Sequence, residues 1–413
     1  MINHDKKNTQ LKHFKFADLT KLYKLNYLLP LLFLFIFLFS GCQKDDQETI
    51  PDPLFYIEHE LISSYSKTDI QQLLNNQEGI PSELSLFINN DISVYKIIYR
   101  TVDTENNEVL ASGALIVPDS NSPLPLISFQ HGTLTNEEDA PSYFSSDDYL
   151  ATAFFASTGY IIALPDYLGY GSSRQLDHPY EHGHSLASAS RDMLRAVREY
   201  DLSNPQFRAS DKLFLTGYSQ GGYATMSLLK LLEEEHPGEF RITAATAGAG
   251  AYNKTETAKK IIEADKELVH LNTFLWVLDT YNKIYGFNRP YSYFFNEPHD
   301  SEIEAGGVFN NTGLNPANLF TTEFRDEILL DPESDFMEAI ADNNNYDWKP
   351  VAPLQLYHGT EDEFVYYLNS QSAYLAMKER GAENVELVTV QGGDHGTTVF
   401  EYFTGTFLFF RRF

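Results

Sequence analysis

Apolar and polar positions follow two different periods along most of the chain, and these periods predict strands and helices in alternation. Short apolar runs predict buried strands at residues 93–100, 109–117, 124–130, 160–165, 213–216, 242–250, 353–358 and 385–391. Apolar residues at helical spacing predict helices at 148–157, 186–200, 224–232, 366–380 and 397–409. This alternation predicts an α/β fold with a mostly parallel sheet and helices on both faces.

The pattern is less regular before this alternation begins. The first two predicted strands flank the pair Asn106-Asn107, which favours a hairpin, and we place that hairpin at one edge of the sheet. Residues 54–76 carry apolar side chains at loosely helical spacing, so we expect a helical segment packed on the core.

The alternation stops between Tyr252 and Pro350. This block predicts a mainly helical cap, inserted between a first core part at 54–251 and a second at 351–413. It holds a cluster of aromatic residues, which either line an acyl or aromatic-ester pocket or form the cap's own core. The cluster comprises Phe274, Trp276, Tyr281, Tyr285, Phe287, Tyr291, Tyr293, Phe294 and Phe295.

The N-terminal residues have the pattern of an export signal. Residues 1–27 carry six lysines and two aspartates. The apolar run 27–39 comes next, is short for a membrane span, and is followed by Ser40-Gly41-Cys42. Small residues before the chain's single cysteine resemble a bacterial lipoprotein signal. That resemblance implies cleavage after residue 41 and lipidation of Cys42. An ordinary signal peptide or a signal anchor is the alternative.

Residues 42–53 are polar and predict a tether. The acidic stretch after Cys42 resembles the export signal of surface-exposed lipoproteins in Bacteroidetes. The resemblance implies an outer-membrane lipoprotein that contacts the membrane through its lipid anchor only. A merely soluble linker is the alternative.

Composition narrows the classes of partner. The chain has 413 residues, 43% of them hydrophobic, which supports a substantial core. Its formal charge of −28 argues against nucleic acid, which such a surface would repel.

The motif G-x-S-x-G occurs at Gly217-Tyr218-Ser219-Gln220-Gly221. A chain of this composition contains it by chance in about one case in ten, so its context must carry the argument. An apolar strand precedes it and a helical pattern follows, as in a strand-turn-helix that exposes a nucleophilic serine. We therefore predict Ser219 as the nucleophile.

A serine hydroxyl needs a histidine to take its proton and an acid to orient that histidine. With this turn the chain order is serine, acid, histidine. Asp362 follows the strand 353–358 and is the predicted acid, with Glu361 in reserve, and His395 follows the strand 385–391 and is the predicted base.

Two backbone N–H groups are expected to bind the oxyanion. Thr133, in the loop after the strand 124–130, supplies one, and Gln220 supplies the other. Because Gln220 is expected to act through its backbone alone, Gln220→Ala should keep much of its activity.

With serine, acid, histidine and oxyanion loop in order, residues 93–413 resemble the α/β-hydrolase superfamily. The stretches Pro165–Gly171, His178-Pro179-Tyr180 and Asp192–Ala196 resemble secretory lipases and related bacterial esterases, in which a cap follows the sixth strand. The resemblance implies hydrolysis of a small-molecule carboxylic ester through an acyl-enzyme, with no cofactor.

Other polar residues are assigned to structural roles. His131 and His358 also end strands, but each would break the chain order. Asp394 and Asp166 are expected to shape their loops. The histidines at 178, 182 and 184 match no metal-site spacing, and residues 342–347 lack the glycine and glutamate of an EF-hand and predict a turn.

Two other functions stay open. A peptidase of the same fold would use a cap carboxylate, such as Glu256, Glu263 or Asp265, to bind a substrate amino terminus. A non-catalytic binding lipoprotein is the other alternative, and the intact order of the three catalytic residue types argues against it.

Overall fold

A computed structural model describes residues 54–76, 81–145, 149–204, 207–309 and 314–413. The predicted signal peptide at 1–41 and the tether at 42–53, with Cys42, lie outside the described residues.

The core is built on one nine-stranded sheet with the order β1-β2-β3-β5-β4-β6-β7-β8-β9. Neighbouring strands from β5 through β4 to β9 pair in parallel, which confirms the predicted mostly parallel sheet. The strands are β1 (Tyr56–Tyr65), β2 (Ile92–Val102), β3 (Glu108–Pro118), β4 (Leu124–Gln130), β5 (Ile161–Pro165), β6 (Ala209–Tyr218), β7 (Ile242–Gly248), β8 (Leu354–Gly359) and β9 (Val385–Val390).

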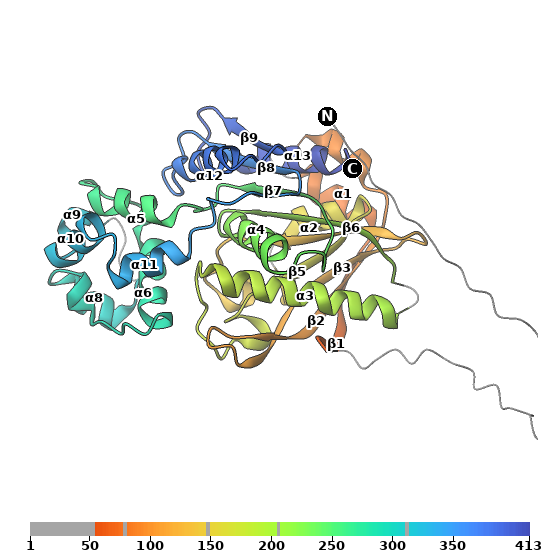
Figure 1. The fold of residues 1–413 in the computed structure, drawn as a ribbon. Helices are drawn as coiled ribbons and strands as arrows, with labels where there is room; N and C mark the ends of the chain where they lie inside the picture. The colour runs from red at the N-terminus through yellow and green to blue at the C-terminus, as the bar shows by residue number, and fades with distance from the viewer. Residues whose placement is uncertain (1–53, 77–80, 146–148, 205–206, 310–313) are drawn as a thin grey trace, which may run out of the picture. The chain divides into compact units, whose positions relative to one another are not determined.

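Helices cover both faces of this sheet (Figure 1). One apolar cluster joins the sheet to α3 (Gly183–Ser203), α4 (Gln220–Lys230) and α12 (Leu368–Glu379). A second joins it to α1 (Lys67–Asn75), α2 (Leu150–Ser157) and α13 (Thr398–Phe410). Strand β5 contributes to both clusters, because Ile161 and Ala163 lie in the first and Ile162 and Leu164 lie in the second. Its period-2 alternation thus buries apolar side chains on both faces.

The N-terminal part differs from the prediction. Residues 56–65 form strand β1 instead of a helix, and the helix α1 begins only at Lys67. The hairpin of β2 and β3 is confirmed, but β1 pairs with β2 and takes the edge position. An open β2 edge offers a row of unpaired backbone groups, and their pairing outweighs a weak helical pattern. The Glu199 carboxylate of α3 accepts the N–H groups of Leu54, Phe55 and Tyr56, which fixes where β1 begins.

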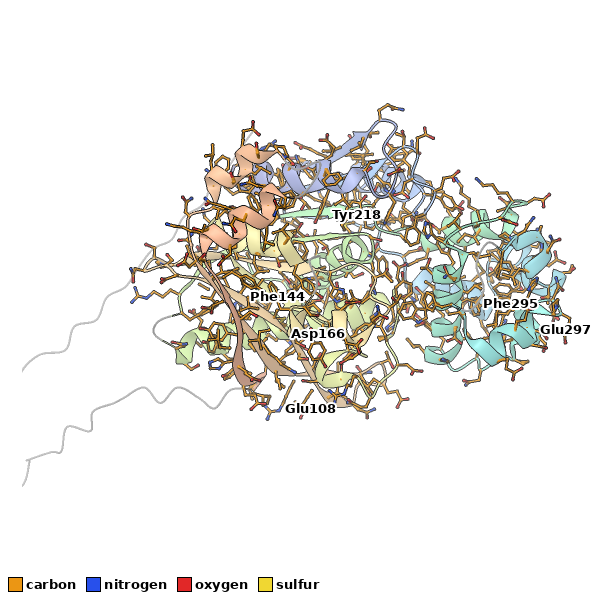
Figure 2. The ribbon with its side chains drawn as sticks, turned by 180° about the vertical axis from the view of Figure 1, so that it is seen from behind. Glu108, Phe144, Asp166, Tyr218, Phe295 and Glu297 are labelled. Carbon is orange, nitrogen blue, oxygen red and sulfur yellow. The ribbon has the colours of Figure 1, made fainter. Side chains whose placement is uncertain are left out.

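The block between β7 and β8 is helical throughout the part that the structure describes, apart from short connections. Its helices are α5 (Lys254–Glu263), α6 (Leu271–Ile284), α7 (Tyr291–Phe294), α8 (His299–Gly306), α9 (Pro316–Leu319), α10 (Thr322–Leu330) and α11 (Asp335–Asp342). We call these helices the cap. They share an apolar cluster of their own, and Phe295 lies within it (Figure 2).

The cap aromatics mainly serve that cluster. Tyr281, Phe294 and Phe295 are buried in it, and the other six named aromatics are partly buried against it. A cavity of about 80 Å³ lies between Phe274, Tyr281 and the helix α10. This volume is far below the roughly 300 Å³ of a small ligand pocket. The contacts therefore favour the cap's own core over an acyl pocket for most of these residues.

Candidate active site

Ser219 occupies a sharp turn between β6 and α4. Its backbone has φ 60° and ψ −124°, a conformation that is strained for a residue with a side chain. Its N–H donates to Gly248 O of the neighbouring strand at 2.9 Å. A Cβ at Gly221 would lie 2.1 Å from Gln130 O, and one at Gly217 would lie 2.3 Å from Gly221 O. The glycines of the motif are thus required by close backbone contacts.

The structure brings Ser219, His395 and Asp362 together. Ser219 Oγ lies 3.0 Å from His395 Nε2, and His395 Nδ1 lies 2.7 Å from Asp362 Oδ2. Since a carboxylate accepts, Nδ1–H donates to Asp362 and Nε2 is left to accept from the serine hydroxyl. Glu361, the reserve acid, is exposed, whereas Asp362 is buried. The arrangement has the geometry needed to move a proton from the serine.

Asp362 is held as a carboxylate. Burial raises its pKa, but hydrogen bonds from His358 and His395 outweigh burial and lower the pKa to about 2. The N–H groups of Phe364 and Val365 donate to its other oxygen at 2.9 and 2.8 Å. A negative charge therefore faces the imidazole of His395 at neutral pH.

The two competing histidines have other partners. His358 is buried with Nε2 2.7 Å from Val365 O and 3.4 Å from Asp362 Oδ2, so it lies beside the acid. His131 is buried between Gly132 O and Asp166 O, at 2.6 and 3.2 Å, and burial lowers its pKa to about 4. Among the described contacts, neither ring reaches Ser219.

Two aspartates hold loops. Asp394 accepts from the N–H and hydroxyl of Thr397 at 2.7 Å and so caps the turn after His395. Asp166 is fully buried and accepts from Ser112 Oγ at 2.6 Å and from Ser142 N at 2.7 Å. Burial raises the pKa of Asp166 to about 6, against these hydrogen bonds. Figure 2 shows Asp166 and Tyr218 in the core, away from Phe295 in the cap.

Three residues around His395, the predicted base, were missed by the sequence reasoning. Tyr218 OH donates to His395 O at 2.8 Å, and the ring of Phe364 lies 4.8 Å from that of His395. His270 of the cap stacks on Phe364 at 4.0 Å. Tyr218 lies inside the motif and could have been considered, but no sequence signal connects His270 with a loop 94 positions later.

The predicted oxyanion residues lie at the ends of the expected elements. Gln220 is the first residue of α4, where backbone N–H groups lack helical partners, and Thr133 follows β4. The Gln220 side chain is buried and donates from Nε2 to His178 Nε2 at 2.9 Å. Thr133 Oγ1 shares a hydrogen bond of 2.8 Å with Tyr180 OH. Both side chains therefore have partners that the sequence reasoning did not foresee.

The histidines at 178, 182 and 184 do not converge on a common point. His178 Nδ1 donates to Leu168 O at 2.7 Å, and His182 Nδ1 bonds Ser185 Oγ at 3.0 Å. No group of three metal-binding side chains occurs within the described ranges. Residues 342–347 join α11 to the core, where Asn343 Oδ1 accepts Gly183 N at 2.9 Å.

Comparisons with known proteins connect this geometry to a family. A model of the secretory lipase family matches residues 145–405. The chain belongs to the secretory lipase family. No match was found among curated proteins. Membership supports an ester-hydrolysing function and a location outside the cytoplasm or at the envelope. None of the helices that the structure describes is both long and apolar enough to span a membrane.

Solved structures share the fold of this secretory lipase. A Legionella pneumophila protein, whose hydrolase activity is itself a proposal, aligns with a TM-score of 0.77 at 24% identity over 87% of this chain and 98% of its own. The rice cell wall degrading esterase LipA of Xanthomonas oryzae gives 0.72 at 23% identity, over 86% and 96%. Candida antarctica lipase A in its closed state gives 0.61 at 17%, over 85% and 82%. These likenesses confirm the predicted α/β-hydrolase fold.

Proposed function

We propose that this secretory lipase cleaves carboxylic esters through an acyl-enzyme on Ser219. Ser219 Oγ attacks the ester carbonyl while His395 Nε2 takes the hydroxyl proton. The imidazolium that forms is stabilised by the Asp362 carboxylate. His395 then gives its proton to the leaving alcohol, and water releases the acid by the same steps in reverse order. The residues named here need no cofactor for this chemistry.

The negative charge of the tetrahedral intermediate needs donors. In this proposal the backbone N–H groups of Gln220 and Thr133 bind the oxyanion. The position of Gln220 at the start of α4 supports this role, because N–H groups at a helix N-terminus favour negative charge.

The hydrogen-bonded series from Asp362 through His395 to Ser219 is the observation that carries the proposal. Its test combines a fluorophosphonate probe with p-nitrophenyl esters of short and long acyl chains. Wild-type protein should be labelled once and should release p-nitrophenol, and Ser219→Ala should do neither. Equal labelling of Ser219→Ala would make another residue the nucleophile.

Two of the three cap carboxylates named for the peptidase alternative have partners within the cap. Glu256 accepts from Lys259 at 2.9 Å, and Asp265 accepts from Asn315 at 3.3 Å, so both carboxylates have partners within the cap. Aminoacyl p-nitroanilides, assayed beside the esters, should therefore be poor substrates. Faster turnover of an anilide than of every ester would favour the peptidase.

We further propose that Cys42 carries a lipid that anchors the protein to the cell envelope. The N-terminal pattern and the secretory family support this location. Cells fed a labelled fatty acid should label the wild-type protein and not Cys42→Ser, and the variant should leave the membrane fraction. Labelling of both proteins would contradict the assignment to Cys42.

A further inference from the structure

One short segment, His178–Gly183, lies between the proposed oxyanion donors and the cap. It connects the loop after β5 with α3, and we call it the junction segment. Glu181 has φ 52°, the left-handed backbone region, at the middle of the segment. Members of the segment contact the core on one side and the cap on the other.

His178 holds the side chain of Gln220. Its Nδ1–H donates to Leu168 O at 2.7 Å, so its Nε2 carries the lone pair that accepts the Gln220 amide at 2.9 Å. Burial lowers the pKa of His178 to about 3, which keeps the ring neutral and able to accept at ordinary pH. Gln220 Oε1 is buried and finds no partner among the described residues. His178 is therefore the contact that orients the Gln220 side chain.

Tyr180 holds the side chain of Thr133. The hydrogen bond between Tyr180 OH and Thr133 Oγ1 is 2.8 Å long, and Tyr180 is only 4% exposed. Two neighbouring members of one segment thus each bind one of the two residues whose N–H groups we assign to the oxyanion. Thr133 follows β4 and Gln220 begins α4, so the two residues come from different elements. The fold of the sheet alone does not require both to contact the same segment.

The cap contacts the same segment. Trp276 of α6 stacks on Tyr180 with ring centroids 4.1 Å apart and an interplanar angle of 2°. The Trp276 ring also meets the ring of His178 edge to face, with centroids 5.5 Å apart. Tyr281 OH donates to Glu181 O at 2.9 Å. Lys254, the first residue of α5, forms a buried ion pair with Glu181. The cap is therefore attached to the residues that hold the oxyanion donors.

We propose that His178 and Tyr180 are positioning residues for the oxyanion hole, and that Trp276 acts on the hole through Tyr180. The inference rests on the proposed function, since it needs Ser219 chemistry and the assigned donors. A hole of this kind works only when its donors meet the oxyanion at hydrogen-bond distance, so small displacements cost rate. The cap then contributes to turnover even for an ester that is too short to reach it.

The first consequence concerns Gln220. Gln220→Ala was expected to keep much of its activity because only the backbone N–H of Gln220 was assigned a role. Because its side chain binds His178, the variant should lose about tenfold in kcat. His178→Phe, which keeps a ring but has no acceptor, should show a similar loss.

The decisive experiment compares Trp276→Leu and Tyr180→Phe with the wild type on p-nitrophenyl acetate and on its thiono analogue. A sulfur anion is a weaker hydrogen-bond acceptor than an oxyanion, so the ester-to-thionoester ratio of kcat/KM reports on the hole. Both variants should lose about tenfold in kcat with KM within about twofold, and both should lower this ratio. Trp276→Phe keeps a stacking ring and should recover most of the loss.

Phe287→Leu is the matched control, because Phe287 is a half-buried cap aromatic whose ring partners are Tyr285 and Phe336. It should leave kcat and the ratio unchanged. Thr133→Val keeps the backbone N–H and removes the bond to Tyr180, so Thr133→Val combined with Tyr180→Phe should lose no more than the worse single variant.

The outcomes separate the two proposals. If wild-type protein does not cleave the acetate or is not labelled at Ser219, the proposed function fails. If the wild type is active and folded Tyr180→Phe and Trp276→Leu keep both kcat and the ratio, the positioning role fails while the proposed function stands. The positioning role would also be overturned by a higher KM with unchanged kcat, or by a lower melting temperature with an unchanged ester-to-thionoester ratio.

Discussion

The turn at Ser219 and the base of the cap are both tightly packed, but they are held by different kinds of contact. At the turn, backbone meets backbone, and glycines at 217 and 221 leave no room for a Cβ. At the base of the cap, side chains make the contacts, through the Lys254–Glu181 ion pair and the Trp276–Tyr180 stack. The position of Ser219 is thus fixed by backbone contacts, whereas the attachment of the cap depends on side chains.

The largest expected effect concerns His395, the proposed base, which lies in the core. His395→Ala should lower kcat/KM on a p-nitrophenyl ester by about 10⁴-fold or more, since no other described ring contacts Ser219 Oγ. His131→Ala removes a buried ring that holds loop backbone and should cost far less. Comparable losses in the two variants would contradict the assignment of His395 as the base.

Substitutions in the ion pair at the base of the cap should mainly lower the stability of the protein. Lys254→Met leaves Glu181 as an unpaired buried charge and should lower the free energy of unfolding by about 3–5 kcal/mol. Adding Glu181→Gln removes that charge and should recover much of the loss. Urea denaturation of the single and double variants measures both values. An equally destabilised double variant would place the cost in packing instead of charge.

The turn can be tested by adding one methyl group. Gly221→Ala places a Cβ 2.1 Å from Gln130 O and should cost about 3 kcal/mol of stability together with most activity. Gly132→Ala is the matched control, because its Cβ would meet Tyr218 O at an ordinary 3.7 Å. Melting temperatures and ester turnover check the pair. A tolerated Gly221→Ala would show that the turn relaxes as easily as a side-chain contact.

The smallest expected effect is a pH dependence of stability. Asp166 has its pKa raised by burial to about 6, so its ionisation disfavours the folded state. That cost is absent below the unfolded pKa of about 4 and grows as pH rises through 6. From pH 7 to pH 5, the wild type should therefore gain about 1 kcal/mol relative to Asp166→Asn.

Urea denaturation at the two pH values measures this difference, and His131 titrates in both proteins and cancels. A constant difference between wild type and Asp166→Asn would mean that Asp166 does not change its charge in this range.

The sequence predicted those features that depend on the pattern within one segment or on the order of the strands. Strand β4 begins and ends at the predicted residues, and Ser219, Asp362 and His395 meet, because parallel strands end at one edge of the sheet. The prediction failed at β1, whose partner strand begins 27 residues after β1 ends and leaves no periodic trace in the segment itself.

Side-chain partners between distant segments could not be predicted either. Tyr180 and Trp276 are 96 positions apart, and nothing in either local pattern indicates a stack. The same holds for His178 and Gln220. Such contacts depend on how elements pack. An argument from chain order therefore finds the three residues that the structure brings together and misses the residues that hold them.

The three N–H groups that bind Glu199 also have a mechanical meaning. Any tension that reaches Leu54 from the preceding chain must first load these bonds, and then the β1–β2 pair in shear. In the strand order, β1 stands at the opposite end of the sheet from β8 and β9, whose following loops carry Asp362 and His395. If residues 42–53 act as the proposed tether, a pull on them would load this far edge of the sheet first, away from the loops that carry Asp362 and His395.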